Sequence, residues 1–244
     1  MSGDALAGRT VVVVGGTSGM GRATARAAAA RGASVVAAGR RPVGERSPLD
    51  GVTEAVVDVA SEASVRALFD GLDRLDHVFV TATSGRPGLL LDQDLATARS
   101  FMDGKFLGSW TCARYAAPLL PPGGSITFVT GGAVERPPRG GSMVTAAFAA
   151  LEGLTRALAI ELGPIRVNTI RPGYTDSEMW DGLGDEARDD LRRRVGASLL
   201  TGRMGTVDDV ADAALFLMAN PQVTGTILTV DGGETLVDPL EAQR

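Results

Sequence analysis

The stretch from Val11 to Arg22, VVVVGGTSGMGR, decides the fold. Four consecutive valines suit a parallel strand that is buried on both faces. The glycines that follow let the backbone turn sharply and approach a ligand closely, and Ala-rich helical sequence begins directly after them. A helix that starts at such a turn points its free N–H groups and the positive end of its dipole at an anion. Strand, glycine turn and helix together predict a site for a nucleotide pyrophosphate.

The spacing of the glycines separates two kinds of nucleotide site. A mononucleotide phosphate loop needs Lys and then Ser or Thr after its last glycine, but Arg22 and Ala23 stand there. The spacing Gly15-x-x-x-Gly19-x-Gly21 is a longer variant of the dinucleotide pattern G-x-G-x-x-G. A turn that only packs the helix against the strand is the alternative. The residues of this turn that we expect to bind a dinucleotide are Gly15, Thr17, Ser18, Gly19, Met20 and Gly21.

Length and composition restrict the class of protein. At 244 residues, with 44% hydrophobic and 22% charged residues, the chain is expected to form one globular domain, residues 1–244. A net charge of −5 argues against a nucleic-acid partner. The single cysteine, Cys112, excludes an internal disulfide and fits a reducing cytoplasm. No secretion signal and no uncharged apolar run long enough for a bilayer is found, so we expect a cytoplasmic protein without a membrane partner.

Strand and helix patterns alternate along the chain. The expected strands are Thr10–Val14, Ser34–Ala38, Glu54–Val57, His77–Thr81, Ser125–Thr130, Arg166–Ile170 and Thr226–Val230. The expected helices are Gly21–Arg31, Glu62–Leu72, Leu95–Leu119, Met143–Leu162 and Val207–Ala219. This alternation predicts an α/β fold with a Rossmann-like, doubly wound parallel sheet of about seven strands and helices on both faces. The charged segment 176–201 has no following strand, so we expect a mobile substrate flap near the ligand.

The end of the second strand bears on the choice of nucleotide. An NAD site carries Asp or Glu about 20 residues after the glycines, where it bonds the ribose 2′-hydroxyl. Here the chain has Arg40 and Arg41, whose guanidinium groups suit a 2′-phosphate, so we expect NADP(H) to be preferred over NAD(H). A solvated arginine pair in a surface turn is the alternative. Asp58, after the third strand, is a candidate to accept a hydrogen bond from the adenine amino group; an ordinary strand-end Asp is the alternative.

These motifs resemble those of the short-chain dehydrogenase/reductase family over nearly the full length of the chain. The family's T-G-x-x-x-G-x-G matches residues 14–21 with only the Thr changed, and Asp58-Val59 matches its adenine-contacting pair. Residues 151–173 resemble the segment that ends in the family's Pro-Gly beside the nicotinamide, and residues 202–219 and 224–233 are specific to the family. The resemblance implies an oxidoreductase that acts on a small molecule. It also implies a homotetramer or a dimer, since the helices at 95–119 and 143–162 commonly pair between subunits in this family.

The resemblance implies further cofactor contacts and a place for the catalytic groups. The additional cofactor-binding positions are Val59, Thr81, Ala82, Thr83, Pro172, Gly173 and Ser177. The family's catalytic Ser, Tyr, Lys and Asn fall on Gly131, Val144, Phe148 and Lys105, so all four usual groups are replaced. Val144 and Phe148 are four residues apart on one helix face, which predicts an apolar pocket wall beside the nicotinamide.

Lys105 is the ionisable group that matches one of those positions. An ammonium in a partly apolar pocket has a lowered pKa and can serve as an acid or as an electrostatic clamp. A lysine that reaches solvent from its helix is the alternative. Tyr174 is a second candidate proton donor, with aromatic packing in the flap as its alternative. His77 opens a strand and is expected to be structural, and no spacing of ligand residues indicates a metal.

Two functions follow from this pattern. The first is an NADP(H)-dependent oxidoreductase with a non-standard active site that reduces a small carbonyl, imine or activated alkene. It is favoured because the cofactor half of the pattern is complete. The alternative is a non-redox, nucleotide-binding protein of the same fold, either an isomerase or cyclase or a regulatory scaffold.

Overall fold

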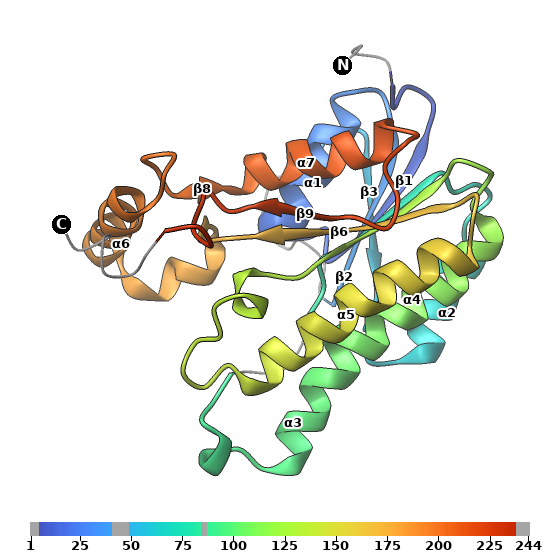
Figure 1. Ribbon diagram of the computed structural model, residues 1–244. Helices are drawn as coiled ribbons and strands as arrows, with labels where there is room; N and C mark the ends of the chain where they lie inside the picture. Colours follow the sequence, from blue (N-terminus) through green and yellow to red (C-terminus); the bar gives the residue numbers. More distant parts are fainter. Residues whose placement is uncertain (1–4, 41–48, 84–86, 238–244) are drawn as a thin grey trace.

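A seven-stranded parallel sheet forms the centre of the molecule, and the strand of valines, β1, lies inside it (Figure 1). The structure is a computed structural model that describes residues 5–40, 49–83 and 87–237. The strands follow the order β3-β2-β1-β4-β5-β6-β9, and every neighbouring pair is parallel. Their bounds are β1 Thr10–Val14, β2 Ser34–Gly39, β3 Val52–Val56, β4 His77–Val80, β5 Ser125–Val129, β6 Arg166–Pro172 and β9 Ile227–Val230. The predicted doubly wound sheet is confirmed.

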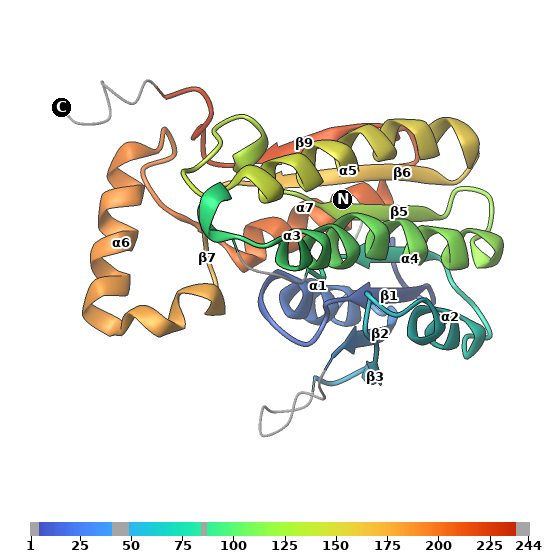
Figure 2. The same ribbon diagram turned by 90° about the horizontal axis from the view of Figure 1, so that it is seen from below.

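Two hydrophobic clusters, one on each face of the sheet, explain why an unbroken run of valines forms β1. Successive side chains of a strand point to opposite faces, so both faces of this strand need apolar residues. Val12 and Val14 belong to one cluster, and Val11 and Val13 belong to the other. The second cluster is covered by α1 (Gly19–Ala29) and α7 (Val207–Ala219). The first is covered by α2 (Glu62–Asp70), α4 (Gly108–Ala116) and α5 (Ser142–Glu161), on the opposite side of the sheet (Figures 1 and 2).

The strand order reverses beside β1. The chain passes from β1 to β2 and β3 on one side, and it then returns to place β4 on the other side of β1. In open parallel sheets, ligands bind outside the carboxyl ends of the strands at such a reversal. The loop after β1 leads directly into α1, so the N-terminus of α1 lies at this point. The fold therefore places the glycine turn where a dinucleotide is expected.

Most predicted elements agree with the structure to within one or two residues, and one predicted helix is divided. The segment 95–119 is divided into α3 (Leu95–Met102), a π-helical turn η2 (Asp103–Leu107), α4 and a short 3₁₀ turn η3 (Ala117–Leu119). An i+3/i+4 pattern does not distinguish one π turn from regular helix, so the sequence suggested a single element. Strand β3 begins at Val52, two residues before its predicted start, and ends at Val56.

The expectation that no strand follows segment 176–201 is wrong. Two-residue strands β7 (Thr175–Asp176) and β8 (Gly205–Thr206) flank this segment and pair with each other. Between them lie the 3₁₀ segment η5 (Glu178–Leu183) and the helix α6 (Asp185–Ser198), which is not among the helices expected from the sequence. Helix α6 is charged around most of its surface and bears ion pairs three and four residues apart, so it shows no clear apolar stripe. The mobility of this segment stays a prediction.

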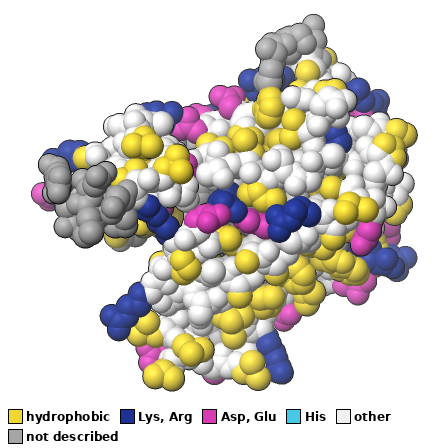
Figure 3. Space-filling view, in the orientation of Figure 1, with side chains coloured by type: hydrophobic (Ala, Val, Ile, Leu, Met, Phe, Trp, Pro, Cys, Tyr) yellow, Lys and Arg dark blue, Asp and Glu magenta, His cyan; other side chains and the backbone are white. Residues whose placement is uncertain are grey.

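Helix α5 is unusually apolar for a helix at the surface. By length and composition it could cross a membrane, a test that core helices of soluble proteins also pass. Only 28% of its most apolar window is buried, and Ile160 is 85% exposed. Trp110 in α4 and Leu107 at the end of η2 are exposed as well, and α4 lies beside α5 (Figure 1). Figure 3 shows hydrophobic side chains over this part of the surface. The protein therefore presents an apolar helical face at its surface.

Candidate active site

The residues predicted from sequence gather at one edge of the sheet. The glycine turn follows β1, Arg40 follows β2, Thr81 follows β4, Gly131 follows β5, and Gly173 follows β6. Because all these strands are parallel, their carboxyl ends meet at the same edge. In the orientation of Figure 1 this edge faces left, where Figure 3 shows a notch between the lobe with α6 and the lobe with α3 and the start of α5.

The glycine turn is tightly packed against its neighbours. A Cβ on Gly21 would collide with the carbonyl of Gly15, and a Cβ on Gly15 would collide with the Thr81 hydroxyl. Gly15 also has φ +89°, a left-handed conformation that favours glycine. A Cβ on Gly39, at the end of β2, would likewise collide with the Thr17 side chain. The backbone of this turn is therefore held in one shape, directly before the start of α1.

The start of α1 carries few groups of its own that would satisfy its N–H donors. Ser18 is the N-cap, but its side chain makes no capping hydrogen bond, and no acidic residue stands in the first turn. Such a terminus is a favourable place for phosphate oxygens. Met20 is partly buried and packs with the cluster beneath α1. This arrangement fits a dinucleotide pyrophosphate.

The residues predicted to contact the adenosine half lie beyond β2 and β3. Arg40 is exposed directly after β2, whereas Arg41 lies outside the described residues. Asp58 is exposed, and its Oδ1 accepts a hydrogen bond from the Ala60 N–H at 3.0 Å. Val59 is buried where the chain meets the start of α4. Thr83 is exposed after β4.

Gly131 and Phe148, the residues expected at the family's Ser and Lys positions, contact each other closely. A Cβ added to Gly131 would lie 3.0 Å from Cε2 of Phe148, which is tighter than an ordinary contact. The Phe148 ring thus fills the space that a serine side chain at position 131 would need. Val144 is one helical turn earlier on α5, so the same face is apolar at both positions. That this face forms a pocket wall beside the nicotinamide stays a prediction.

Lys105 is buried beside Phe148 and does not reach solvent. Its side chain is 2% exposed, and Nζ lies 5.6 Å from the centroid of the Phe148 ring. The same ammonium donates a long hydrogen bond of 3.5 Å to the carbonyl of Ala82, the residue after Thr81. Burial lowers the pKa of Lys105 to about 8, because the charged form loses hydration.

Two features of the sequence and fold set Lys105 apart. It is the sole lysine of the chain, and all 23 other residues in the Lys and Arg count of 24 are arginine. It also lies in the π-helical turn η2, and π turns within helices are frequent at functional sites. The π turn places Lys105 in the buried interior. The alternative of a lysine that reaches solvent is therefore wrong.

The second candidate proton donor, Tyr174, lies farther out. It is 44% exposed, and its ring stacks on Trp180 with centroids 6.4 Å apart. This contact fits the packing alternative. Pro172 ends β6, and the N–H of Gly173 donates to Val230 in β9. Ser177 accepts a hydrogen bond from the Met179 N–H at 3.4 Å and so caps η5.

A buried ion-pair network behind the pocket was missed by the sequence analysis. Arg171 in β6 makes two hydrogen bonds to the Glu152 carboxylate, at 2.9 and 2.6 Å, and a third to Glu135 at 2.7 Å. The Thr130 hydroxyl donates to Glu152 at 3.1 Å. Glu152 raises the pKa of Arg171 through these hydrogen bonds. The network ties together β5, β6, α5 and the loop that carries Gly131, so it holds the pocket wall in place.

Glu234 is another residue that sequence reasoning did not identify. Its carboxylate accepts a hydrogen bond from the Tyr174 N–H at 3.0 Å and lies near the backbone of Gly132 and Gly173. Burial raises the pKa of Glu234. His77, by contrast, behaves as expected of a structural residue: it is buried, and its Nδ1 lies 2.9 Å from the Ser125 hydroxyl at the opposite edge of the sheet.

Comparisons with known proteins agree with the fold and with the motifs. A family model described as enoyl-(acyl carrier protein) reductase matches residues 14–235. The short-chain dehydrogenase/reductase ATR9 of Stachybotrys chlorohalonatus is 32% identical over 95% of this chain and 98% of its own. A small-chain dehydrogenase crystallised with NADPH is 33% identical, covers 94% of this chain and 99% of its own, and has a TM-score of 0.79. The reductase/Diels-Alderase MalC of Malbranchea aurantiaca is 28% identical over 97% of this chain and 100% of its own, with a TM-score of 0.88. The chain therefore belongs to the short-chain dehydrogenase/reductase family, whose members are NAD(P)-dependent oxidoreductases.

Proposed function

We propose that the protein is an NADP(H)-dependent reductase with a non-standard active site, which reduces a small carbonyl, imine or activated alkene. One observation carries the proposal. The buried ammonium of Lys105 lies beside Phe148, in the pocket where the family's catalytic groups are expected. The glycine turn that would hold a dinucleotide stands at the same edge of the sheet. A cofactor site and a candidate proton donor therefore meet at one place.

The fit of a dinucleotide rests on the shape of the glycine turn. A Cβ on Gly21 would collide with the carbonyl of Gly15, so the first turn of α1 packs closely against the start of the glycine turn, as a dinucleotide site requires. The N–H groups at the start of α1 would hold the pyrophosphate, and Thr81, Ala82 and Gly173 line the edge farther along. When bound, the nicotinamide supplies the hydride.

In this proposal Lys105 supplies the proton. With a pKa of about 8, Nζ is protonated at neutral pH, yet it gives up a proton more easily than an ordinary lysine. The N–H bond of the ammonium breaks as the substrate oxygen, nitrogen or carbon receives the proton, and the neutral amine then takes a proton from water. The apolar wall of Val144 and Phe148 excludes water around this group and strengthens its electrostatic effect.

The preference for NADP(H) is supported by Arg40. It is exposed directly after β2, where an acidic residue would favour NAD(H). A guanidinium donates charge-assisted hydrogen bonds to a 2′-phosphate. The NADPH-bound relative described above is consistent with this choice.

Two measurements test the proposal. NADPH is expected to bind at least about tenfold more tightly than NADH, with the ratio lost in Arg40→Asp, because charge-assisted hydrogen bonds are worth about 1.5–3 kcal/mol. Equal affinities in the unaltered protein would remove the Arg40 argument. NADPH oxidation is then followed with a panel of ketones, imines and enones. A Lys105→Ala variant with unchanged turnover would remove Lys105 from the mechanism.

A non-redox function on the same scaffold is the second candidate. MalC, a relative with the same fold, is named as both a reductase and a Diels-Alderase. An apolar pocket wall beside a bound nucleotide suits a cyclisation or isomerisation that needs shape and exclusion of water more than a proton donor. Tight NADPH binding with substrate conversion but no NADPH consumption would favour this function over reduction.

Subunit assembly, the flap and the location in the cell belong to the same proposal. The apolar face of α5, with exposed Ile160, supports a homotetramer in which α4 and α5 pair between subunits. Light scattering of the unaltered protein and of Ile160→Lys tests this, and the variant is expected to dissociate. Segment 176–201 would act as the substrate flap. The single, buried Cys112 is compatible with the reducing cytoplasm.

A further inference from the structure

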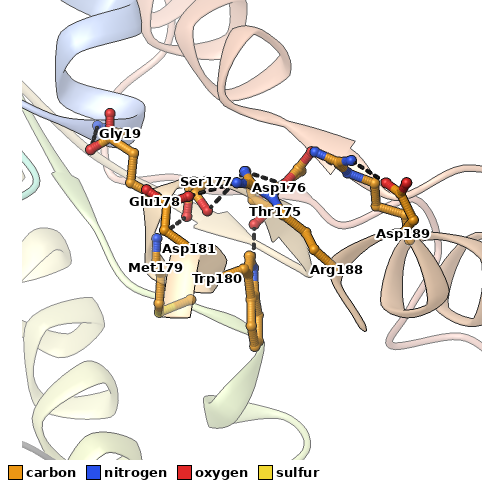
Figure 4. A network of polar contacts seen from close by, with 11 residues as sticks. Gly19, Thr175, Asp176, Ser177, Glu178, Met179, Trp180, Asp181, Arg188 and Asp189 are labelled. Carbon is orange, nitrogen blue, oxygen red and sulfur yellow. Dashed lines mark hydrogen bonds and ion pairs between the residues drawn. The ribbon is translucent and has the colours of Figure 1, made fainter. Parts of the chain in front are cut away.

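A carboxylate from segment 176–201 occupies the N-terminus of α1. The N–H of Gly19, the first residue of α1, donates a hydrogen bond of 3.3 Å to Oε2 of Glu178. Figure 4 shows the Glu178 side chain reaching from η5 to this N–H. The two residues are 159 positions apart in the chain, so the contact exists only in the folded protein.

The contact supplies what the sequence of α1 lacks. The first turn of α1 contains no acidic residue, and the Ser18 side chain makes no capping hydrogen bond. A negative charge at a helix N-terminus is stabilised by the exposed N–H groups and by the helix dipole. Glu178 therefore serves as an anion at the positive end of a helix that would otherwise have none from its own first turn.

The same N–H group belongs to the proposed cofactor site. Gly19 is one of the glycines of the turn, and its N–H is among the donors that would hold a pyrophosphate. A carboxylate and a phosphate have charges of the same sign and use the same donor. The two cannot both stay within hydrogen-bond distance of Gly19 without strong repulsion.

The backbone around Glu178 is held in place by its neighbours. Arg188 of α6 pairs with Asp176 at 2.8 Å and with Asp181 at 2.6 Å, and it also donates to the carbonyl of Ser177. The Trp180 indole donates to the carbonyl of Thr175 at 2.9 Å (Figure 4). Glu178 lies between these anchored residues, so the segment presents its carboxylate to α1 from a defined position.

We propose that Glu178 is an internal competitor of the cofactor: its carboxylate occupies a phosphate donor of α1 in the free enzyme, and cofactor binding displaces it. The inference rests on the proposed dinucleotide site and adds a residue that lowers its affinity. A competitor that must first leave reduces the apparent affinity by the fraction of molecules in which the site is open. Displacement of Glu178 also moves or releases η5, which links occupation of the cofactor site to the substrate flap.

The first test is a calorimetric titration of the full-length protein with NADPH. Glu178→Gln keeps the size of the side chain and removes its charge. We expect this variant to bind NADPH about two- to fivefold more tightly, the range that corresponds to one exposed charge at a helix N-terminus. Glu186→Gln is the matched control, because it removes an exposed glutamate of the same segment from the first turn of α6. Its dissociation constant should equal that of the unaltered protein.

The possible results separate this inference from the proposed function. Equal NADPH affinity for the unaltered protein and Glu178→Gln would overturn the role of Glu178 and leave the cofactor site standing. An equal gain in Glu186→Gln would also overturn it, because general charge would then explain the effect. If none of the three proteins binds NADPH, the proposed function fails, and this inference fails with it.

A second measurement follows the segment directly. The chain has two tryptophans, so Trp110→Phe leaves Trp180 as the sole indole, two residues from Glu178. Titration with NADP⁺ is expected to change the emission of Trp180, and a further Glu178→Gln substitution is expected to shift the emission of the free protein towards that of the bound state. Emission of the free protein that is identical with and without Glu178→Gln would contradict displacement of the segment.

Discussion

Substitution of Lys105 by Met should make the protein more stable at neutral pH. The two side chains are similar in length, but Met carries no charge. Lys105 is 2% exposed, and burial lowers its pKa from 10.5 to about 8. One pKa unit corresponds to about 1.36 kcal/mol, and the pKa of Lys105 is lowered by about 2.5. The buried charge therefore lowers the free energy of unfolding by about 3 kcal/mol at pH 7. Lys105→Met should therefore raise the free energy of unfolding by roughly that amount.

The dependence on pH gives the prediction its sign. Between about pH 8 and pH 10.5 the unfolded chain keeps the Lys105 proton while the folded protein has lost it. Stability therefore rises with pH across this window in the unaltered protein. From pH 7 to pH 9.5 the contribution of this lysine should rise by about 2 kcal/mol. Other groups titrate equally in both proteins. The difference in unfolding free energy between Lys105→Met and the unaltered protein should therefore shrink by the same amount from pH 7 to pH 9.5.

Urea unfolding of both proteins at pH 7 and pH 9.5 measures this difference. Because the chain has one lysine, NMR of protein with ¹³C-labelled lysine gives one side-chain signal, and its titration reports the pKa of Lys105 directly. A titration midpoint near 10.5, together with a Lys105→Met variant that is no more stable at pH 7, would refute a buried, charged Lys105. We also expect Lys105→Met to lose about 10²- to 10⁴-fold in turnover, the usual contribution of a general acid.

Three further predictions concern the pocket and the sheet. Gly131→Ser should lower stability by about 1–3 kcal/mol, because its side chain meets the Phe148 ring, and Phe148→Ala in the same chain should restore part of that loss in urea unfolding. Arg171→Met leaves the Glu152 carboxylate, 6% exposed, without its bidentate partner, so unfolding free energy at pH 7 should fall by about 3–5 kcal/mol, and no loss would contradict a buried pair. Burial lowers the pKa of His77 to about 4, so the unfolded chain takes up a proton first as pH falls below 6.5. Stability should drop by about 2 kcal/mol between pH 6.5 and pH 5, a drop that His77→Gln should remove.

The parallel sheet, the glycine turn at its edge and the family could be predicted from short stretches of sequence. Valine runs and glycine turns reflect local backbone preferences. In strands and helices, the side chains that face the core recur every two or 3.6 residues, so burial leaves a pattern in the sequence. These patterns predicted β1, α1 and α7 closely. They failed for α6, where charged residues hide the apolar side, and for the π turn that contains Lys105, which an i+4 pattern does not reveal.

The sequence by itself determined the parallel sheet and the glycine turn, and it predicted which residues stand at the family's catalytic positions. The sequence also contains a single lysine, Lys105, and this composition is a signal that could have singled out position 105 as a candidate functional residue. Only the tertiary structure decided that Lys105 is buried against Phe148, that Phe148 fills the space beside Gly131, and that Glu178 reaches Gly19. These contacts join residues that are between 17 and 159 positions apart. No local pattern encodes such a contact, because it depends on where the packed sheet and helices place each side chain.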